Sequence, residues 1–315
     1  MKCLIVQPVH VDGISLLEEA GIEPVFCPSA DMVTVARMIS GCEAVITRDA
    51  GLSAAAINAA DVLRVVVVHG AGHDAVDKEA ASQCGVLVCN TPGANARSVS
   101  ELALGLALAV ARHIPAADRS ERAGIRGFRE METFMELSGK TALIVGWGAT
   151  GAGLGRMLKA AFDARILVYS PRTAAVEGFE RVEKLEDGLA QADLVSLHTP
   201  LRPETRGLID ARALSRVKPG AILVNTARAG LVDEAALAEA IASGRVAGAG
   251  LDVYSHEAPS GPLSQSNRVI FTPHLGGATL EALRRVAIGA ARNVLMALSG
   301  ERPATALNDP AWSYA

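Results

Sequence analysis

Residues 141–158 read TALIVGWGATGAGLGRML, and no other segment is as informative about the fold. Its first five residues form an apolar run typical of a buried strand, and a helical pattern follows the glycine-rich turn GWGATG. Such a turn can simply join a strand to a helix. With both elements in place, however, its glycines allow a tight turn and a close approach, and the helix start points free amides at an anion. The stretch therefore predicts a site for the pyrophosphate of a dinucleotide. The residues expected there are Gly146, Gly148, Ala149, Thr150 and Gly151.

Apolar runs alternate with helical patterns along the first hundred residues. Short strands separated by helices indicate βαβ units and a parallel sheet. The expected strands are Cys3–Gln7, Pro24–Phe26, Ala44–Thr47, Val65–Val68 and Val86–Val88, and the expected helices are Ile14–Ala20, Met32–Ile39, Ala54–Ala60 and Lys78–Cys84.

A second series of the same kind starts at Thr141, and two long helical patterns flank it. One runs from Ser98 to about Arg119, and the other runs from Leu280 to Leu298. The strands expected in this series are Thr141–Val145, Arg165–Tyr169, Leu194–Leu197, Ala221–Val224, Ala249–Leu251 and Val269–Phe271. The predicted fold is α/β, with two doubly wound parallel-sheet domains. A Rossmann dinucleotide-binding domain at 98–284 is inserted into a flavodoxin-like substrate-binding domain formed by 1–97 and 285–315.

Composition and charge exclude several classes of protein. The chain has 315 residues, 50% hydrophobic and 3% aromatic, which is typical of helices packed on parallel strands. The net charge of −4, with both signs interspersed, predicts no nucleic-acid partner. The longest apolar stretch, Leu102–Ala111, is too short to span a bilayer, and the N-terminus has no signal-peptide pattern. Five cysteines without a C-x-x-C pair are expected to be free thiols with no metal site. We therefore expect a cytoplasmic protein with no membrane partner.

Three loops, each after an expected strand, carry Arg228, Glu257 and His274. Ligands of open α/β sheets bind outside the carboxyl ends of the strands, so these loops are expected to converge. A guanidinium can clamp a carboxylate through two parallel hydrogen bonds. A carboxylate beside an imidazole favours the protonated imidazole, which can then deliver a proton near neutral pH. Beside a nicotinamide, these three side chains predict a site that reduces a 2-keto acid.

Arg228 and His274 each have a structural interpretation as well. Arg228 could form an ion pair between two loops, and a single histidine after a strand is often a satisfied structural residue. The position of His274 between Pro273 and Gly276-Gly277 favours a held loop instead. A nucleotide-binding methyltransferase is a further alternative, but it gives the three side chains no joint role.

The end of the strand Arg165–Tyr169 bears on the choice of cofactor. An acidic residue usually stands there and binds the ribose hydroxyls, but this chain has Ser170-Pro171-Arg172. Without the carboxylate a 2′-phosphate is not repelled, and Ser170 and Arg172 can bind one. We therefore expect NAD(P) as the cofactor, with NADP weakly preferred. The alternative is that Arg172 is a solvated surface residue.

Several ordered motifs resemble those of the D-isomer-specific 2-hydroxyacid dehydrogenases, which include phosphoglycerate dehydrogenase, glyoxylate and hydroxypyruvate reductases, and D-lactate dehydrogenase. The resemblance covers nearly the whole chain. It is carried by HGAGHDAVD (69–77), NTPGANARSVSELAL (90–104), the GWGATG turn, LHTPLRPETRGLI (197–209), NTARAGLVDEAAL (225–237), GAGLDVYSHE (248–257) and TPHLGGAT (272–279).

The resemblance implies roles for individual residues. Arg228 would hold the substrate carboxylate and carbonyl, Glu257 and His274 would form the acid–imidazole pair, and Asp252 would bind the nicotinamide carboxamide. The other substrate residues it implies are His69, Gly70, Ala71 and Gly72, and the other cofactor residues are His198, Thr199, Pro200, Thr226 and Ala227.

The expected function is hydride transfer between a nicotinamide cofactor and a small 2-keto acid or D-2-hydroxy acid. Hydroxypyruvate or glyoxylate is favoured over phosphohydroxypyruvate, because Asp49 follows Arg48 where phosphoglycerate dehydrogenases commonly carry serine, and no regulatory domain follows. The alternative is an NAD(P)-sensing, corepressor-like interaction protein without significant turnover. We also expect a symmetric homodimer built around Ser98–Arg119 and the loop after it, including Phe128 and Phe134, because this segment is too apolar for a solvated helix.

Overall fold

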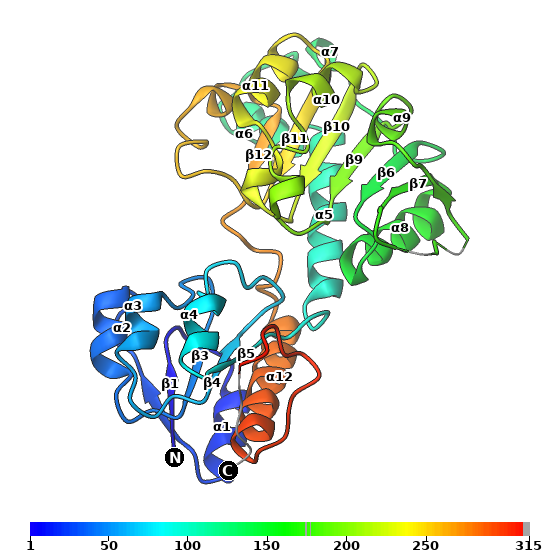
Figure 1. The fold of residues 1–315 in the computed structure, drawn as a ribbon. Helices are drawn as coiled ribbons and strands as arrows, with labels where there is room; N and C mark the ends of the chain where they lie inside the picture. The colour runs from blue at the N-terminus through cyan, green and yellow to red at the C-terminus, as the bar shows by residue number, and fades with distance from the viewer. Residues whose placement is uncertain (174, 177, 311–315) are drawn as a thin grey trace. The chain divides into compact units, whose positions relative to one another are not determined.

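The computed structural model describes residues 1–173, 175–176 and 178–310. The chain divides into two compact units: unit 1 comprises Met1–Asn95 with Gly277–Ala315, and unit 2 comprises Ala96–Gly276. Unit 2 is thus inserted between two segments of unit 1 (Figure 1).

Unit 1 contains a five-stranded parallel sheet in the order β2-β1-β3-β4-β5. Val66 and Val68 of β4 pack in one core with residues of α2, α3 and α4, whereas Val65 and Val67 pack in another with residues of α1 and α12. Helices therefore cover both faces, which is why β4 is a continuous apolar run without alternation. The strands are β1 (Lys2–Ile5), β2 (Glu23–Phe26), β3 (Ala44–Thr47), β4 (Val65–Val68) and β5 (Leu87–Cys89), and the helices are α1 (Val11–Glu19), α2 (Met32–Met38), α3 (Ala54–Asn58), α4 (Lys78–Gln83) and α12 (Leu280–Leu298).

Unit 2 contains a seven-stranded parallel sheet in the order β12-β11-β10-β9-β6-β7-β8. The strands are β6 (Thr141–Val145), β7 (Arg165–Tyr169), β8 (Glu180–Arg181), β9 (Leu194–Leu197), β10 (Ala221–Asn225), β11 (Val246–Leu251) and β12 (Val269–Phe271). The α-helices are α5 (Ala96–Ala111), α6 (Ile114–Arg122), α7 (Phe128–Met131), α8 (Ala149–Phe162), α9 (Leu185–Leu189), α10 (Ala211–Arg216) and α11 (Glu234–Ala242), and three short 3-10 turns are η1 (Pro203–Thr205), η2 (Ala229–Leu231) and η3 (Pro262–Gln265).

The strand order of unit 2 places its ligand edge. From β6 the chain moves one way to β7 and β8 and the other way to β9 through β12. This reversal makes β6 the switch point, where the carboxyl ends of the strands leave room for a ligand. The predicted fold class, a Rossmann unit inserted into a flavodoxin-like unit, is confirmed.

The single helix expected from Ser98 to Arg119 is wrong, because α5 and α6 form two helices bent by 56° at their junction. Pro115, in the first turn of α6, lacks the amide hydrogen that would bond to the carbonyl of Ala111. His113 takes a left-handed conformation with a φ of +50° and starts the second helix. The freed carbonyl of Ala111 accepts a hydrogen bond from the amide of Met135 (2.9 Å).

The boundaries of unit 2 also differ from the predicted range 98–284. The main cause is α12, whose early residues Ala282 and Val286 are buried. The helix packs on α1, β3 and β4, and a Cβ on Gly13 of α1 would lie only 2.7 Å from the carbonyl oxygen of Ala287. The whole of α12 therefore belongs to unit 1, and the chain leaves unit 2 before the helix begins.

Candidate active site

Three neighbouring strands of unit 2 end in the loops that carry the predicted catalytic residues. Strands β10, β11 and β12 lie side by side and run parallel, so the loops that follow them leave the same edge of the sheet (Figure 1). Arg228 follows β10, Glu257 follows β11 and His274 follows β12. The loops share one edge as predicted, and the roles of the three side chains remain predictions.

The side chain of Asn225 shapes the loop that carries Arg228. Asn225 ends β10 and is 1% exposed. Its Nδ2 donates to the carbonyl oxygen of Arg228 (2.8 Å), and its Oδ1 accepts from the amide of Ala227 (3.0 Å). A buried amide therefore holds the turn from which the half-buried Arg228 extends. Asn225 was not among the residues predicted from the sequence, although asparagine at a strand end, bonding its own backbone two residues on, is a recognisable turn signal.

Glu257 and His274 lie on turns with exposed side chains. The carbonyl oxygen of Glu257 accepts hydrogen bonds from the amides of Ser260 (3.0 Å) and Gly261 (2.8 Å), which close the turn. His274 has a φ of +55°, which is uncommon for a residue with a Cβ. Among the described residues, no hydrogen bond or ion pair joins the Glu257 carboxylate to the His274 imidazole. Their pairing stays a prediction.

Asp252 follows β11 directly, and its side chain bonds to the loop of His274. The residue is 1% exposed. Its Oδ1 accepts from the Thr272 hydroxyl (2.6 Å) and the Leu275 amide (2.7 Å), and its Oδ2 accepts from the Gly276 amide (2.9 Å). A carboxylate has about four acceptor sites, so one remains on Oδ2 for another donor such as a carboxamide.

Gly146 and Gly148, in the turn between β6 and α8, have different roles. Gly146 has a φ of +98°, and a Cβ there would lie 2.6 Å from the carbonyl oxygen of His198, so the fold itself requires glycine. Gly148 has an ordinary φ of −86°, and the space where its Cβ would be is open. In the part of the chain that the structure describes, no side chain caps α8 at Gly148, so the first amides of this 14-residue helix, including those of Ala149 and Thr150, are left for a ligand.

Glycine is also required at Gly151, the last predicted position of this turn. A Cβ there would lie 2.1 Å from the carbonyl oxygen of Gly146, so α8 starts tight against β6. The open cradle at Gly148 together with this tight packing fits a pyrophosphate.

The loops after β9 and β10 contain two buried polar atoms without a hydrogen-bond partner among the described residues. These atoms are Nδ1 of His198 and Oγ1 of Thr226. His198 bonds through Nε2 to the Ser196 hydroxyl (2.8 Å), and burial lowers the pKa of His198 to about 4, so the ring is neutral at pH 7. Thr199 and Pro200 continue the first loop, and Ala227 continues the second. Unpartnered polar atoms in the loops after β9, which lies next to β6, and after β10 fit a polar ligand such as a dinucleotide.

The chain after β7 carries the predicted phosphate-binding residues. The Ser170 hydroxyl accepts from the amide of Trp147 (3.2 Å) and bonds to the Thr173 hydroxyl (2.8 Å), so Ser170 lies against the glycine turn. Arg172 is 65% exposed in its side chain and pairs with Glu204 (2.5 Å). Ser170 is therefore placed beside the predicted cofactor site, whereas the charge of Arg172 is already offset by a carboxylate.

The predicted substrate residues 69–72 lie in unit 1, after β4. His69 is 7% exposed, its Nε2 is buried without a partner among the described residues, and burial, followed by the Arg48 charge, lowers its pKa to about 4. Gly70 has a φ of +148°, and its amide donates to the Thr91 hydroxyl (2.9 Å). Ala71 and Gly72 are exposed. The loop thus offers exposed backbone next to a neutral, buried imidazole.

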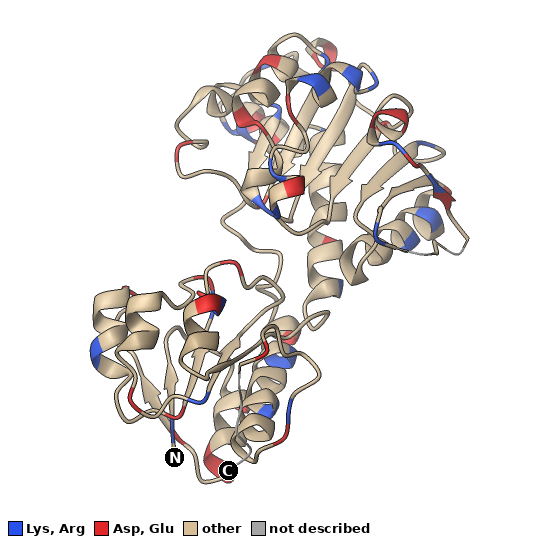
Figure 2. Cartoon of the chain, in the orientation of Figure 1, with Lys and Arg blue, Asp and Glu red and all other residues tan. Residues whose placement is uncertain are grey.

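Two further observations concern the distribution of charged residues and the length of the apolar helices. Lysine and arginine alternate with aspartate and glutamate over each unit (Figure 2). Across the described residues, no single helix is long and apolar enough to cross a membrane; α5 and α6 pass that test only as a bent pair.

Comparison with known proteins places the chain in a family. The model of the family described as D-isomer specific 2-hydroxyacid dehydrogenase, NAD binding domain, matches residues 104–276. Hydroxypyruvate reductase of Thermotoga maritima is 37% identical over 257 residues, which cover 80% of this chain and 83% of that protein. The chain belongs to the D-isomer-specific 2-hydroxyacid dehydrogenase family.

Two further comparisons show how much of the chain is similar to known proteins in sequence and in structure. D-3-phosphoglycerate dehydrogenase of Mycobacterium tuberculosis is 44% identical over 287 residues, which cover 89% of this chain and 53% of that protein. The chain thus spans about half the length of the first curated relatives that it matches. The crystal structure of the TT0316 protein from Thermus thermophilus superposes with a TM-score of 0.90 at 33% identity, covering 98% of this chain and 100% of that one.

Proposed function

We propose that this chain is an NAD(P)-dependent dehydrogenase that interconverts a small 2-keto acid and its D-2-hydroxy acid. The observation that carries the proposal is the common edge of β10, β11 and β12, whose loops bring Arg228, Glu257 and His274 to one side of a sheet with an open glycine turn at its switch point. Bound NAD(P)H would supply the hydride; Gly148, Ala149 and Thr150 would hold its pyrophosphate, and Asp252 its carboxamide.

The other steps of the proposed reaction fall to residues of the chain. Arg228 binds the substrate carboxylate and polarises the carbonyl, because its planar fork matches a carboxylate in two parallel hydrogen bonds. His274 donates a proton from its imidazolium to the carbonyl oxygen as the oxygen gains charge. Glu257 favours the protonated imidazole when the two side chains approach.

A substitution at His274 tests the assignment. His274→Ala should lower turnover of a 2-keto acid by about 10²–10⁴-fold, the usual contribution of a general acid. Binding of NAD(P)H should stay nearly unchanged, since the glycine turn is untouched. Steady-state kinetics and fluorescence titration measure the two quantities. Near-normal turnover would remove His274 from the mechanism, and no turnover by the unmodified protein with any 2-keto acid would favour the corepressor-like alternative.

For the substrate we propose hydroxypyruvate or glyoxylate. Asp49 is exposed, and its charge acts on His69 beside the predicted substrate loop, where it would repel a phosphate. Phosphohydroxypyruvate is the second candidate, because Arg48 acts on the same imidazole and relatives at 44% identity are named D-3-phosphoglycerate dehydrogenase.

The two substrates are distinguished by catalytic efficiency with hydroxypyruvate and with phosphohydroxypyruvate. We expect the unphosphorylated substrate to be preferred, and Asp49→Ser to shift the ratio toward the phosphorylated one. A phosphorylated substrate already preferred by the unmodified protein would reverse the assignment.

For the cofactor we propose that NADPH is accepted and weakly preferred. Ser170 leaves the 2′-phosphate unrepelled. The exposed pair of Arg172 with Glu204 is worth only about 0–1 kcal/mol, so Arg172 can leave it. A charge-assisted contact with a phosphate is worth roughly 1.5–3 kcal/mol, which favours the move.

We also propose a homodimer in the cytoplasm. Ile114, Ile125, Met131 and Phe134 are 53%, 54%, 68% and 38% exposed on and after α6, where a second copy would cover them. All five cysteines are free, as suits a reducing compartment. Light scattering at micromolar concentration tests the dimer, and Ile125→Asp should shift the mass toward the monomer. A monomeric mass for the unmodified protein contradicts it.

A further inference from the structure

The loop that carries His274 is held by its backbone. The His274 imidazole is exposed and makes no hydrogen bond within the described residues, so no neighbouring side chain aims it. Its left-handed φ of +55° is strained for a residue with a Cβ, and such strain persists only where the surroundings impose it. The residues on both sides of His274 must therefore supply the constraint.

One part of this constraint is Asp252. Its buried carboxylate binds Thr272 on one side of His274 and the amides of Leu275 and Gly276 on the other. All three bonds converge on a single side chain beside β11. The bond from the Gly276 amide fixes the peptide group before this residue, and the Gly276 carbonyl oxygen, in the next peptide group, bonds to another partner.

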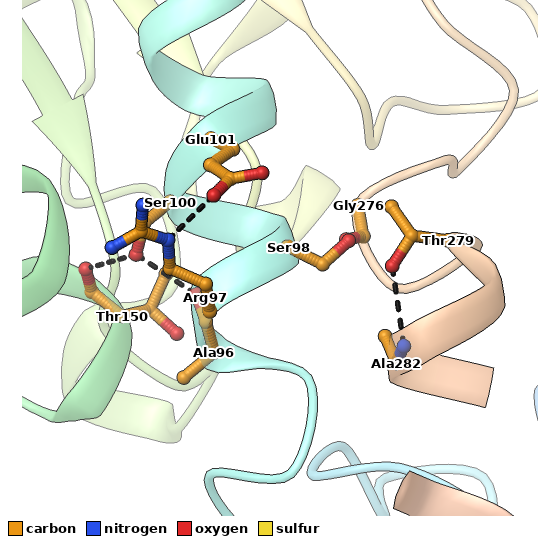
Figure 3. Close-up of polar contacts among 9 residues, drawn as sticks. All are labelled: Ala96, Arg97, Ser98, Ser100, Glu101, Thr150, Gly276, Thr279 and Ala282. Carbon is orange, nitrogen blue, oxygen red and sulfur yellow. Dashed lines mark hydrogen bonds and ion pairs between the residues drawn. The ribbon is translucent and has the colours of Figure 1, made fainter. Parts of the chain in front are cut away.

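The partner of that carbonyl is Ser98. Ser98 lies in the first turn of α5 and is 5% exposed, and its hydroxyl donates to the carbonyl oxygen of Gly276 (2.6 Å), toward which it extends in Figure 3. A Cβ on Gly276 would lie 3.1 Å from Asp252 Oδ2 and 3.3 Å from a methyl of Val99, so the peptide fits closely between β11 and α5. The helix itself is fixed, because the neighbouring Ser100 hydroxyl donates to the carbonyl of Thr150 at the start of α8 (2.8 Å).

We propose that Ser98 is a positioning residue for His274. Asp252 and Ser98 bond to the two peptide groups that flank the Cα of Gly276, and this clamp keeps His274 in the left-handed conformation that aims its imidazole. Ser98 touches neither substrate nor cofactor in this proposal and acts only through the loop 272–276. The kinetic part rests on the proposed function, whereas the structural part does not.

The structural part is tested by hydrogen exchange on the protein without cofactor. Ser98→Ala removes the hydrogen bond to the Gly276 carbonyl oxygen, so the Leu275 and Gly276 amides are held by Asp252 alone. Their exchange should become about 2- to 10-fold faster, the effect of losing one buried neutral hydrogen bond. Ser120→Ala is the matched control, because Ser120 is 6% exposed and also donates to a backbone carbonyl, that of Ile125, within unit 2. Unchanged exchange at Leu275 and Gly276 in Ser98→Ala overturns the proposal.

The kinetic part uses Ser98→Ala with and without His274→Ala. Alone, Ser98→Ala should lower kcat about 5- to 50-fold with KM and NAD(P)H affinity little changed, and the solvent isotope effect on kcat should rise because proton delivery slows. In the His274→Ala background the same substitution should have almost no further effect. If Ser98→Ala lowers kcat equally in both backgrounds, Ser98 does not act through His274. The same conclusion follows if the substitution raises KM and weakens cofactor binding while kcat is unchanged.

The two proposals fail in distinguishable ways. If no 2-keto acid is turned over while exchange at Leu275 and Gly276 responds to Ser98→Ala, the clamp stands and the proposed function falls. If turnover is normal and exchange does not respond, the clamp falls and the proposed function stands.

Discussion

Replacing Gly148 by alanine separates the needs of the fold from the needs of the cofactor. Among the described residues, no atom lies within 4 Å of the position that its Cβ would take, and its φ of −86° suits any residue. Gly148→Ala should therefore fold normally. The new methyl group would stand where the proposed pyrophosphate approaches α8, so the substitution should act on cofactor binding.

The magnitudes follow from the same geometry. Alanine in place of glycine at an N-cap costs about 0.5–1 kcal/mol, and the reduced freedom of the unfolded chain returns about 0.4–1 kcal/mol, so the free energy of unfolding should change little. An extra methyl at a closely packed contact costs about 1–3 kcal/mol, which predicts about a 5- to 150-fold weaker affinity for NAD(P)H.

Gly146→Ala is the contrasting variant in the same turn. Its φ of +98° and the 2.6 Å approach of a Cβ to the His198 carbonyl oxygen predict a loss of stability of about 2–5 kcal/mol. Urea unfolding measures stability, and quenching of Trp147 fluorescence on titration with NADH or NADPH measures affinity. Wild-type affinity in Gly148→Ala would refute a pyrophosphate at this turn. Equal destabilisation by both variants would refute the division of roles.

Three further predictions concern the substrate, the cofactor and pH. Arg228→Lys keeps the charge but loses the planar fork, so kcat/KM should fall at least about 100-fold while NAD(P)H affinity holds; a variant with wild-type efficiency contradicts the two-point clamp. Ser170→Asp should shift the ratio of efficiencies with NADPH and NADH toward NADH by about 10-fold or more, because a carboxylate repels the 2′-phosphate; an unchanged ratio shows that the phosphate lies elsewhere. Burial lowers the pKa of His69 and His198 to about 4, so between about pH 6.5 and 4 the unfolded chain binds more protons and stability falls as the pH falls, by up to about 1.4 kcal/mol per pH unit for each group. Urea unfolding from pH 7 to 4.5 should show this slope, and replacing both histidines by asparagine should flatten it.

Local sequence patterns were enough to predict the bounds of the elements whose apolar runs are flanked by clear turn residues. Strands β6, β7, β9 and β12 and helix α12 begin and end where the apolar runs and turn residues predict. The break between α5 and α6 was also visible in the sequence, because Pro115 cannot continue a helix, but the apolar residues around it suggested continuity.

Part of the candidate site was also predictable from local sequence patterns. Arg228, Glu257 and His274 were predicted as site residues because each follows a strand, and parallel strands end at a common edge. The residues that hold their loops were not found by their type alone. Asn225 and Ser98 are ordinary polar residues in sequence, and Asp252 was assigned only to the cofactor. Their roles depend on partners that the fold brings to them.

The kind of fold and the edge of the sheet that carries the proposed site could be predicted from local sequence alone, because strand and helix periodicity and the glycine turn are short-range properties. The tertiary structure decided which polar atoms meet. The bond from Ser98 to Gly276 joins residues 178 positions apart, and the single carboxylate of Asp252 receives three donors from a different loop. A hydrogen bond forms only within a few tenths of an ångström of its ideal length, and positions of that accuracy are set by the packing of the whole unit.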